Sequence, residues 1–236
     1  MCDSIKPFMQ HETQDAICES LETLSQAGPY YQWLTSRVGP YIKGKALEIG
    51  AGIGNFARWA REFSSDYHVS DNDPRLVHEL SQEFTHAVCW DLFTPYPGNE
   101  TFDTIVILNV VEHLEDDQEA LRRIHSRLNP GGHLILMVPA MNFLYGSLDQ
   151  SFGHYRRYTK KSISKVIQQA DFHLIKTEYL NVVGMAGWFV YGKLLKARKL
   201  PQQLCSRFHL MLPLLKLERP VAYFMGLSVL AIARKS

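Results

Sequence analysis

The stretch from Leu47 to Asn55 limits the fold of this chain more than any other part of the sequence. It reads L-E-I-G-A-G-I-G-N, so glycines stand at every second position. The apolar run Lys45–Ile49 predicts a short strand, and Asn55–Phe63 predicts the helix that follows. Glycines at a strand-to-helix turn permit positive φ and let a ligand approach the backbone, while the helix N-terminus favours negative charge. We therefore expect a ligand-binding loop at this turn.

Strand-like and helix-like segments alternate after this loop. Further strands are predicted at Tyr67–Ser70, Ala87–Trp90, Phe102–Asn109 and His133–Val138, and helices at Pro74–Phe84, Asp117–Leu128 and Ser162–Ala170. Such alternation predicts an α/β chain with a doubly wound, mostly parallel sheet and helices on both faces. Two last predicted strands, Phe172–Tyr179 and Leu227–Ala233, enclose an insertion, and we expect them to form an antiparallel pair at the sheet edge.

Length and composition fit one domain spanning residues 1–236. We divide it into an N-terminal helical lid (1–44, with a helix at 14–26), a cofactor-binding core (45–180), a helical insertion (181–224) and a last strand (225–236). The net charge of +1 gives no basis for nucleic-acid binding. The scattered cysteines and the polar N-terminus predict a cytoplasmic protein, and the apolar stretches are shorter than the ~20 residues of a transmembrane helix.

Two kinds of cofactor site compete for the glycine loop. A dinucleotide site requires G-x-G-x-x-G, and its third glycine would fall on Asn55, so a nucleotide-dependent oxidoreductase is disfavoured. Asp71 ends the second predicted strand, where a carboxylate can accept both hydroxyls of a ribose. Asp71 could instead cap the next helix, although Asp73 is better placed to do so.

The spacing E-x-G-x-G-x-G resembles motif I of the class I S-adenosylmethionine-dependent methyltransferases. Asp71–Pro74 matches the family's D-x-x-P, Asn109–Leu114 its N-x-x-E-H-L, and Leu128–Gly132 its L-x-P-G-G. The resemblance implies a Rossmann-like seven-stranded fold with S-adenosyl-L-methionine as cofactor and S-adenosyl-L-homocysteine as product. The residues that it places at the cofactor are Glu48, Gly50, Ala51, Gly52, Gly54, Asp71, Asn72, Asp91, Leu92, Asn109 and Val110.

Two histidines are the candidate catalytic bases. His113 follows the fourth strand and His154 follows the fifth, so both belong at the carboxyl edge of the sheet, where open α/β sheets bind ligands. His113 could instead support the cofactor pocket with Glu112, and a reaction driven by proximity alone needs no base. We expect no metal, because Asn109 stands where related metal-dependent enzymes place an acidic ligand.

A basic and aromatic segment from His154 to Lys161 is the candidate substrate site. The residues assigned to substrate are Tyr30, Tyr145, Tyr155, Arg156 and Arg157, with at most one of the two arginines entering the site. A solvated basic turn is the competing interpretation. The stretch from Val138 to Gly146, with Asp149 and Gly153–Tyr158 after it, also looks like a bacterial methyltransferase subgroup associated with glycan, lipid or secondary-metabolite pathways. The basic and apolar segment Lys193–Arg219 fits a membrane contact, a homodimer interface or a lid equally well.

The sequence therefore predicts a methyltransferase that uses S-adenosylmethionine and acts on an oxygen of a small-molecule, glycan or lipid-linked acceptor. The alternatives are N- or C-methylation of a secondary metabolite, and a catalytically silent binding protein that keeps the fold.

Overall fold

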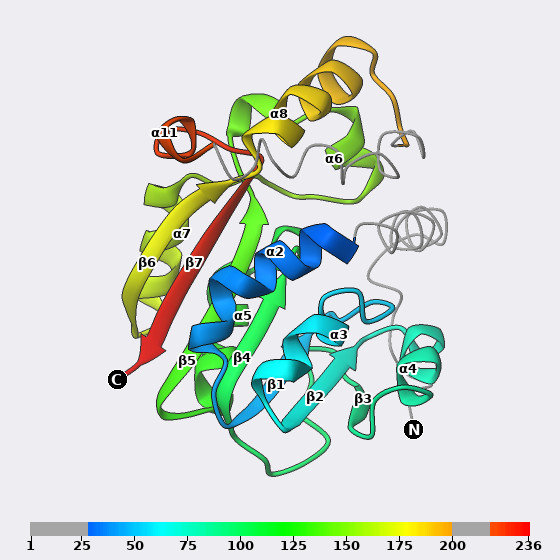
Figure 1. Cartoon of the computed structure of the whole chain (residues 1–236), viewed down its shortest axis with the longest axis vertical. Coiled ribbons are helices and arrows are strands. Elements are labelled where there is room, and N and C mark those ends of the chain that lie inside the picture. The colour runs from blue at the N-terminus through cyan, green and yellow to red at the C-terminus, as the bar shows by residue number, and fades with distance from the viewer. Residues whose placement is uncertain (1–27, 200–217) are drawn as a thin grey trace.

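The computed structural model describes residues 28–199 and 218–236. It contains one sheet with the strand order β3-β2-β1-β4-β5-β7-β6 (Figure 1). The strands are β1 (Lys45–Ile49), β2 (Asp66–Asp71), β3 (Ala87–Cys89), β4 (Phe102–Leu108), β5 (Leu128–Pro139), β6 (Phe172–Leu180) and β7 (Ser228–Lys235). Strands β1 to β5 pair in parallel, and β7 runs antiparallel to both β5 and β6. The predicted doubly wound sheet with an antiparallel pair at its end is confirmed, with β7 second from the edge and β6 outermost.

Helices cover both faces of the sheet. They are α2 (Gly28–Val38), α3 (Ala57–Ala60), α4 (Pro74–Ser81), α5 (Asp117–Arg127), α6 (Ser147–Ser151), α7 (Lys160–Gln169), α8 (Val182–Trp188), the π-helix Phe189–Leu194 and α11 (Arg219–Ala222). On one face, Leu121 of α5 and Ile163 of α7 pack against the sheet. On the other, Leu34 of α2 and Leu80 of α4 do so. Burial on both faces explains why the central strands are apolar throughout.

Side chains along each strand point alternately into one core and the other. Leu47 and Ile105 belong to the core that contains α5 and α7, while Ala46 and Val106 belong to the core that contains α2 and α4. Successive side chains of a strand point to opposite faces, so neighbouring residues enter different cores. The carboxyl ends of the parallel strands β1 to β5 lie at one edge of the sheet, and that of β5 lies near α6 and α8 (Figure 1).

Three predicted elements differ from the structure by three residues or more at one end, and the others in the described residues by at most two. The helix expected at Asn55–Phe63 is only α3 followed by a 3-10 turn at Arg61–Phe63. The helix expected at Pro74–Phe84 ends at Ser81. Strand β5 begins at Leu128 rather than His133, because Leu128 pairs with Phe102 across a register shift, so the N-P-G-G segment lies inside the strand. The predicted helix 14–26 and the centre of the insertion lie outside the described residues.

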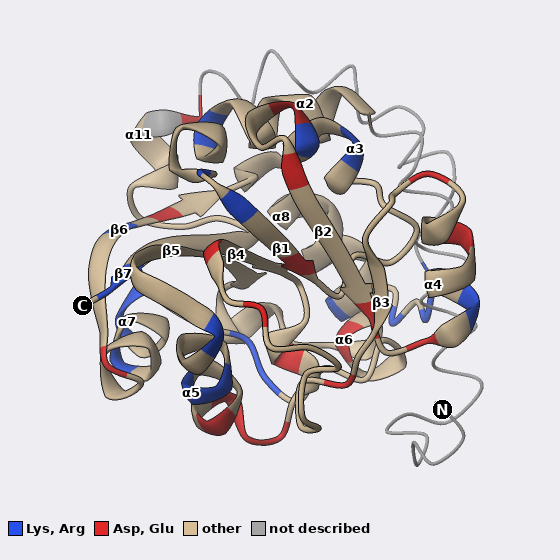
Figure 2. Cartoon of the chain, turned by 90° about the horizontal axis from the view of Figure 1, so that it is seen from below, with Lys and Arg blue, Asp and Glu red and all other residues tan. Residues whose placement is uncertain are grey.

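Both signs of charge occur on the helices around the sheet, and the strands in the centre are mostly uncharged (Figure 2). No helix in residues 28–199 or 218–236 is long and apolar enough to span a membrane. Large apolar side chains are nevertheless exposed on the π-helix and just after α11, including Leu194 and Leu195, both 64% exposed, and Tyr223 and Phe224, both 70% exposed.

Candidate functional site

The glycine loop has the backbone that the sequence predicts for it. Gly50, Gly52 and Gly54 have φ values of +71°, +58° and +81°. The N–H groups of Gly50 and Ala51 both donate to the carbonyl of Ser70, at 2.8 and 2.9 Å, which fastens the loop to the end of β2. A Cβ on Gly50 would collide with Cγ2 of Val110, so a side chain at position 50 is excluded sterically as well as conformationally.

Asp71, at the end of β2, is hydrogen-bonded to this loop. Its Oδ2 accepts a hydrogen bond from the N–H of Gly52 at 2.9 Å, and its Oδ1 accepts one from the N–H of Asp73 at 3.0 Å. Burial raises the pKa of Asp71 above its ordinary value, and these backbone hydrogen bonds oppose the rise. Each carboxylate oxygen accepts about two hydrogen bonds, so capacity for ribose hydroxyls remains. Asp73, not Asp71, caps α4 by accepting from the N–H of Arg75.

Glu48 is buried beside Asp71, with 3% of its surface exposed. Its Oε2 accepts a hydrogen bond of 2.8 Å from the hydroxyl of Tyr67. Burial raises the pKa of Glu48 to about 8, although the bond from Tyr67 lowers it. The carboxyl group therefore holds a proton over much of the neutral range, and in the part of the chain that the structure describes it has no ion-pair partner.

The remaining residues assigned to the cofactor lie around the same strand ends. Asn72 is exposed after β2, and Leu92 is buried in the core. Asp91 accepts a hydrogen bond from the N–H of Phe93 at 2.8 Å, so its carboxylate forms a tight turn after β3. Asn109 ends β4 with φ of +53°, a left-handed conformation that Asn tolerates better than most residues. These positions form a rim along β1, β2, β3 and β4 that could hold S-adenosylmethionine.

A buried polar cluster follows β4 and β5. Glu112 and His113 lie on the 3-10 turn Val111–His113, and the ring of His113 packs edge-on against that of His154, with centroids 4.8 Å apart. His154 Nε2 lies 4.0 Å from Glu112 Oε1. Among the described residues, the buried side-chain atoms without a hydrogen-bond partner are Glu112 Oε1 and Oε2, His113 Nδ1 and Arg157 Nη2. Unpaired buried polar atoms are costly, and all four belong to this cluster.

Asp149 on α6 holds the cluster together. Its Oδ1 lies 2.9 Å from His154 Nδ1 and accepts from Arg157 Nε at 2.7 Å. Its Oδ2 accepts from Trp188 Nε1 at 3.2 Å and from the N–H of Gly146 at 3.0 Å. Burial alone would raise the pKa of Asp149, but the bond to His154 and the charge of Arg157 hold it below its ordinary value. The carboxylate therefore stays charged and fixes the orientation of His154.

The two predicted bases differ in electrostatics. Burial, with a smaller contribution from His154, lowers the pKa of His113 to about 3. A group with so low a pKa is a poor proton acceptor at neutral pH, because an efficient base titrates near the working pH. His154 has the geometry of an oriented base, with Nδ1 fixed by Asp149 and Nε2 facing Glu112.

The five predicted substrate residues have different surroundings. Arg157 is buried and donates to Asp149 and to the carbonyl of Ala140, whereas Arg156 pairs with Asp117 at the start of α5. Tyr145 donates its hydroxyl to the carbonyl of His154 at 2.8 Å, and half of the Tyr155 surface is exposed. Tyr30 packs against Trp33 on α2, away from this cluster in the chain. Of these five residues, only Arg157 brings a charge into the cluster. The sequence analysis expected at most one of the two adjacent arginines there.

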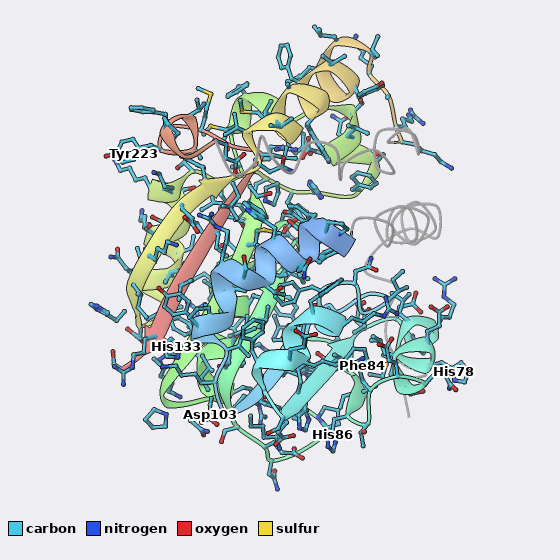
Figure 3. All side chains as sticks on the ribbon, in the orientation of Figure 1. His78, Phe84, His86, Asp103, His133 and Tyr223 are labelled. Carbon is cyan, nitrogen blue, oxygen red and sulfur yellow. The ribbon has the colours of Figure 1, made fainter. Side chains whose placement is uncertain are left out.

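Other histidines lie far from the strand ends. Figure 3 places His78, His86 and His133 toward the end of the molecule opposite α6 and α8. The sequence analysis did not assign Asp149 or Trp188 to the site. Asp149 belongs to the stretch that resembles the bacterial subgroup, but the sequence indicates no role for it, because its partners His154, Arg157 and Trp188 lie on other elements.

The chain resembles methyltransferases of known sequence and structure. A family model described as a methyltransferase domain matches residues 9–177. Phosphoethanolamine N-methyltransferase 2 of Caenorhabditis elegans is 26% identical over 162 residues, and the match covers 63% of this chain but only 36% of that protein. The chain thus spans about a third of the length of this relative.

Two solved structures share the fold. An S-adenosylmethionine-dependent methyltransferase from Archaeoglobus fulgidus superposes with a TM-score of 0.60 at 18% identity, covering 88% of this chain and 94% of that one. The N-methyltransferase NodS from Bradyrhizobium japonicum, solved with S-adenosyl-L-homocysteine, superposes with a TM-score of 0.54 at 15% identity, covering 97% and 94%. The chain belongs to the methyltransferase-domain family, and its sheet has the fold of the S-adenosylmethionine-dependent methyltransferases.

Proposed function

We propose that this protein transfers a methyl group from S-adenosylmethionine to an oxygen of a small-molecule, glycan or lipid-linked acceptor. The observation that carries the proposal is the position of the buried polar cluster beside the glycine loop. Val110 packs against Gly50, and Glu112 follows two residues later, so the loop and the cluster share one edge of the sheet. Cofactor and acceptor would meet there.

The cofactor supplies an electrophilic methyl group when it is bound. The residues of the glycine loop and Asp71 fit it, because the loop presents bare backbone and Asp71 keeps free acceptor capacity for ribose hydroxyls. Transfer requires the acceptor atom to be held about 3 Å from the methyl carbon and in line with the bond that breaks. The chain's own task is therefore to position the acceptor and to remove its proton.

The cluster suits a hydroxyl acceptor. His113 Nδ1 and both oxygens of Glu112 are buried, have no hydrogen-bond partner among the described residues, and can each accept a hydrogen bond. A hydroxyl can donate to such a group, and a hydroxyl is also the acceptor that most needs help in losing its proton. Arg157 Nη2 supplies an unpaired donor on the same cluster, which suits an acceptor that carries an anionic group nearby.

The exposed apolar residues around α8 and α11 favour a lipid-linked acceptor. Trp188 bonds to Asp149, and the π-helix that continues from it exposes Leu194 and Leu195. Lys193 and Lys196 flank these leucines in the sequence. An apolar patch with basic neighbours fits a surface of anionic lipid, and a cytoplasmic protein with such a patch would reach its acceptor at the membrane. A homodimer interface on this patch is the competing interpretation.

N-methylation is the second candidate. The C. elegans relative and NodS are both named N-methyltransferases. The carboxyl group of Glu112 could receive an ammonium group as well as a hydroxyl. Mass spectrometry of the methylated product, which separates O-methyl from N-methyl fragments, distinguishes the two.

Calorimetric titration with S-adenosylhomocysteine tests the cofactor, with NADH as the control ligand. We expect binding of the first and none of the second. Asp71→Ala should weaken binding at least about tenfold, since hydrogen bonds to a charged acceptor are each worth roughly 1.5–3 kcal/mol. Asp73→Ala is the matched control: it removes a helix cap, at a stability cost of about 1 kcal/mol, and should leave the affinity unchanged. Equal loss in both variants would contradict the assignment of Asp71 to the ribose.

A further inference from the structure

Three side chains of the polar cluster have the composition of a metal site. Glu112, His113 and His154 each offer one ligand atom, and these atoms lie within 4.8 Å of one another. Glu112 is 1% exposed and the side chain of His154 is 8% exposed. Two imidazoles and one carboxylate are a common ligand set for catalytic zinc, which keeps a fourth position open.

The orientation of His154 leaves a lone pair facing Glu112. Its Nδ1 lies 2.9 Å from the charged carboxylate of Asp149, which holds the ring proton on that nitrogen. Nε2, 4.0 Å from Glu112 Oε1, is then unprotonated and can bind a metal. A carboxylate on the far nitrogen is the usual support of a metal-binding histidine, because it fixes both tautomer and ring orientation.

His113 is arranged in a complementary way. The backbone carbonyls of Phe152 and Gly153 act on its ring as hydrogen-bond acceptors. Nδ1 has no partner, so these carbonyls face Nε2 and favour a proton there. The lone pair of His113 is therefore on Nδ1, which is buried and unpaired. Both histidines thus keep the proton on the nitrogen that faces the protein and a lone pair on the other nitrogen.

Glu112 is a buried carboxyl group that has no paired cation in residues 28–199 or 218–236. Burial raises the pKa of Glu112 to about 8, and among the described residues neither of its oxygens has a hydrogen-bond partner. The nearest permanent cation, Arg157, gives its Nε to Asp149 and its Nη1 to the carbonyl of Ala140. Arg157 makes no bond to Glu112, so the cluster brings two imidazole nitrogens and a carboxyl group together without a paired cation among the described residues, and a metal ion could replace the proton of Glu112.

A second cluster shows what distinguishes this one. Asp66, His68 and His86 also bring ligand atoms together, but His68 Nε2 is already bonded to Asp66 Oδ1 at 2.7 Å, and His86 is exposed. The rings of His68 and His86 stack with centroids 4.2 Å apart, so they lie face to face instead of directing lone pairs at one point. That cluster is a hydrogen bond between buried His68 and a partly exposed Asp66, beside an exposed histidine, and it serves as a control.

We propose that Glu112, His113 and His154 bind a divalent transition-metal ion, Zn²⁺ being the best match, with the acceptor oxygen as fourth ligand. The metal site stands on the geometry alone, while the role of the acceptor oxygen rests on the proposed function. Ligand atoms in a tetrahedral zinc site are about 3.4 Å apart, whereas those of this cluster lie within 4.8 Å of one another and His154 Nε2 is 4.0 Å from Glu112 Oε1, so side-chain movements of up to about 1.4 Å close the site. The expectation of no metal was based on Asn109, which is not among these residues.

Coordination would prepare a hydroxyl acceptor for methyl transfer. A bound metal ion lowers the pKa of a coordinated hydroxyl, whose proton leaves to solvent. The oxygen lone pair then forms the bond to the methyl carbon while the carbon–sulfur bond of the sulfonium breaks. The electron pair of that bond stays on sulfur, so the products are the methyl ether and S-adenosylhomocysteine.

Metal titration of the full chain tests the site directly. The protein is stripped with a chelator, dialysed and titrated with Zn²⁺ by calorimetry, and Co²⁺ is added in parallel as a spectroscopic probe of tetrahedral coordination. We expect one tightly bound ion per chain. Glu112→Gln and His154→Gln should each weaken binding at least 100-fold, and Asp149→Asn, which acts through His154, about 10–100-fold. His68→Gln should bind as the wild type does.

The outcomes separate the metal site from the proposed function. Glu112→Gln removes a buried carboxylate, so it should stay folded, and its melting curve confirms this before binding is interpreted. No stoichiometric zinc in the wild type, or equal affinity in Glu112→Gln, overturns the metal site and leaves His154 with Asp149 as the base. Loss of the ion in His68→Gln overturns it as well. The affinity for S-adenosylhomocysteine is measured on the same samples. If the protein binds S-adenosylhomocysteine but no zinc, the metal site is rejected and the proposed function stands.

Discussion

Replacing Glu48 with Gln should make the protein more stable, by an amount that grows with pH. Glu48 is 3% exposed, and its carboxyl group accepts a hydrogen bond from the hydroxyl of Tyr67. Burial raises its pKa from 4.5 to about 8. Between these two values the folded protein keeps a proton that the unfolded chain has released, so the free energy of unfolding falls as pH rises.

The magnitude follows from the size of the shift. Each pH unit in this window removes about 1.4 kcal/mol, which makes about 3 kcal/mol at pH 7 and about 5 kcal/mol above pH 8. Glutamine has the same shape, still accepts the bond from Tyr67 and does not titrate. The stability gain of Glu48→Gln should therefore be small near pH 4.5, about 3 kcal/mol at pH 7 and largest above pH 8.

Urea unfolding at pH 5, 7 and 8.5 measures this dependence. Glu79→Gln, an exposed carboxylate on α4, is the control and should show no such trend. Tyr67→Phe removes the bond that lowers the pKa of Glu48, so it should move the midpoint of the pH dependence upward. A stability difference between wild type and Glu48→Gln that is equal at pH 5 and pH 8.5 would refute the assignment of a proton to Glu48.

Two further perturbations test the packing of the site. Arg157→Ala should cost about 3–5 kcal/mol in urea unfolding, because it leaves buried Asp149 without its ion-pair partner, whereas Arg156→Ala, at a partly exposed pair, should cost less than about 1 kcal/mol. Comparable costs would contradict the placement of Arg157 inside the cluster. Gly50→Ala should lower the melting temperature and weaken S-adenosylhomocysteine binding, since its φ of +71° alone costs a side chain about 1–2 kcal/mol and its Cβ meets Val110. An unchanged melting temperature would show that the loop adapts.

The sheet could be predicted from the sequence because its signals are local. Each parallel strand is an apolar run between turn residues, and each helix has an amphipathic pattern, so the element order follows without tertiary information. The error at β5 has a tertiary cause. Asn129-Pro130-Gly131-Gly132 has the composition of a turn, but the pairing of Leu128 with Phe102 makes the segment part of the strand.

The polar cluster was only partly predictable, because its contacts join separate elements. The ends of β4 and β5 place His113 and His154 at one edge of the sheet, and that much follows from strand order. The sequence cannot show which of Arg156 and Arg157 turns inward. That choice depends on Asp149, whose carboxylate accepts from Arg157 while Asp117 on α5 pairs with Arg156. The assignment of Tyr145 to substrate also lacked this information, since its hydroxyl is bonded to the carbonyl of His154.

Asp149 also explains why the C-terminal insertion belongs to the site. Its carboxylate accepts from Trp188 of α8 while it holds His154 and Arg157, so one buried group ties the start of the insertion to the proposed reaction centre. The guanidinium of Arg157 lies 4.8 Å from the ring centroid of Trp188, which adds a second contact between the two. A change in the packing of α8 must therefore alter the surroundings of His154. We infer that an acceptor or lipid surface that moves α8 would act on the reaction through this carboxylate. Trp188→Phe keeps an aromatic ring but loses the hydrogen bond to Asp149. Comparing turnover with cofactor affinity in this variant would separate the two contacts.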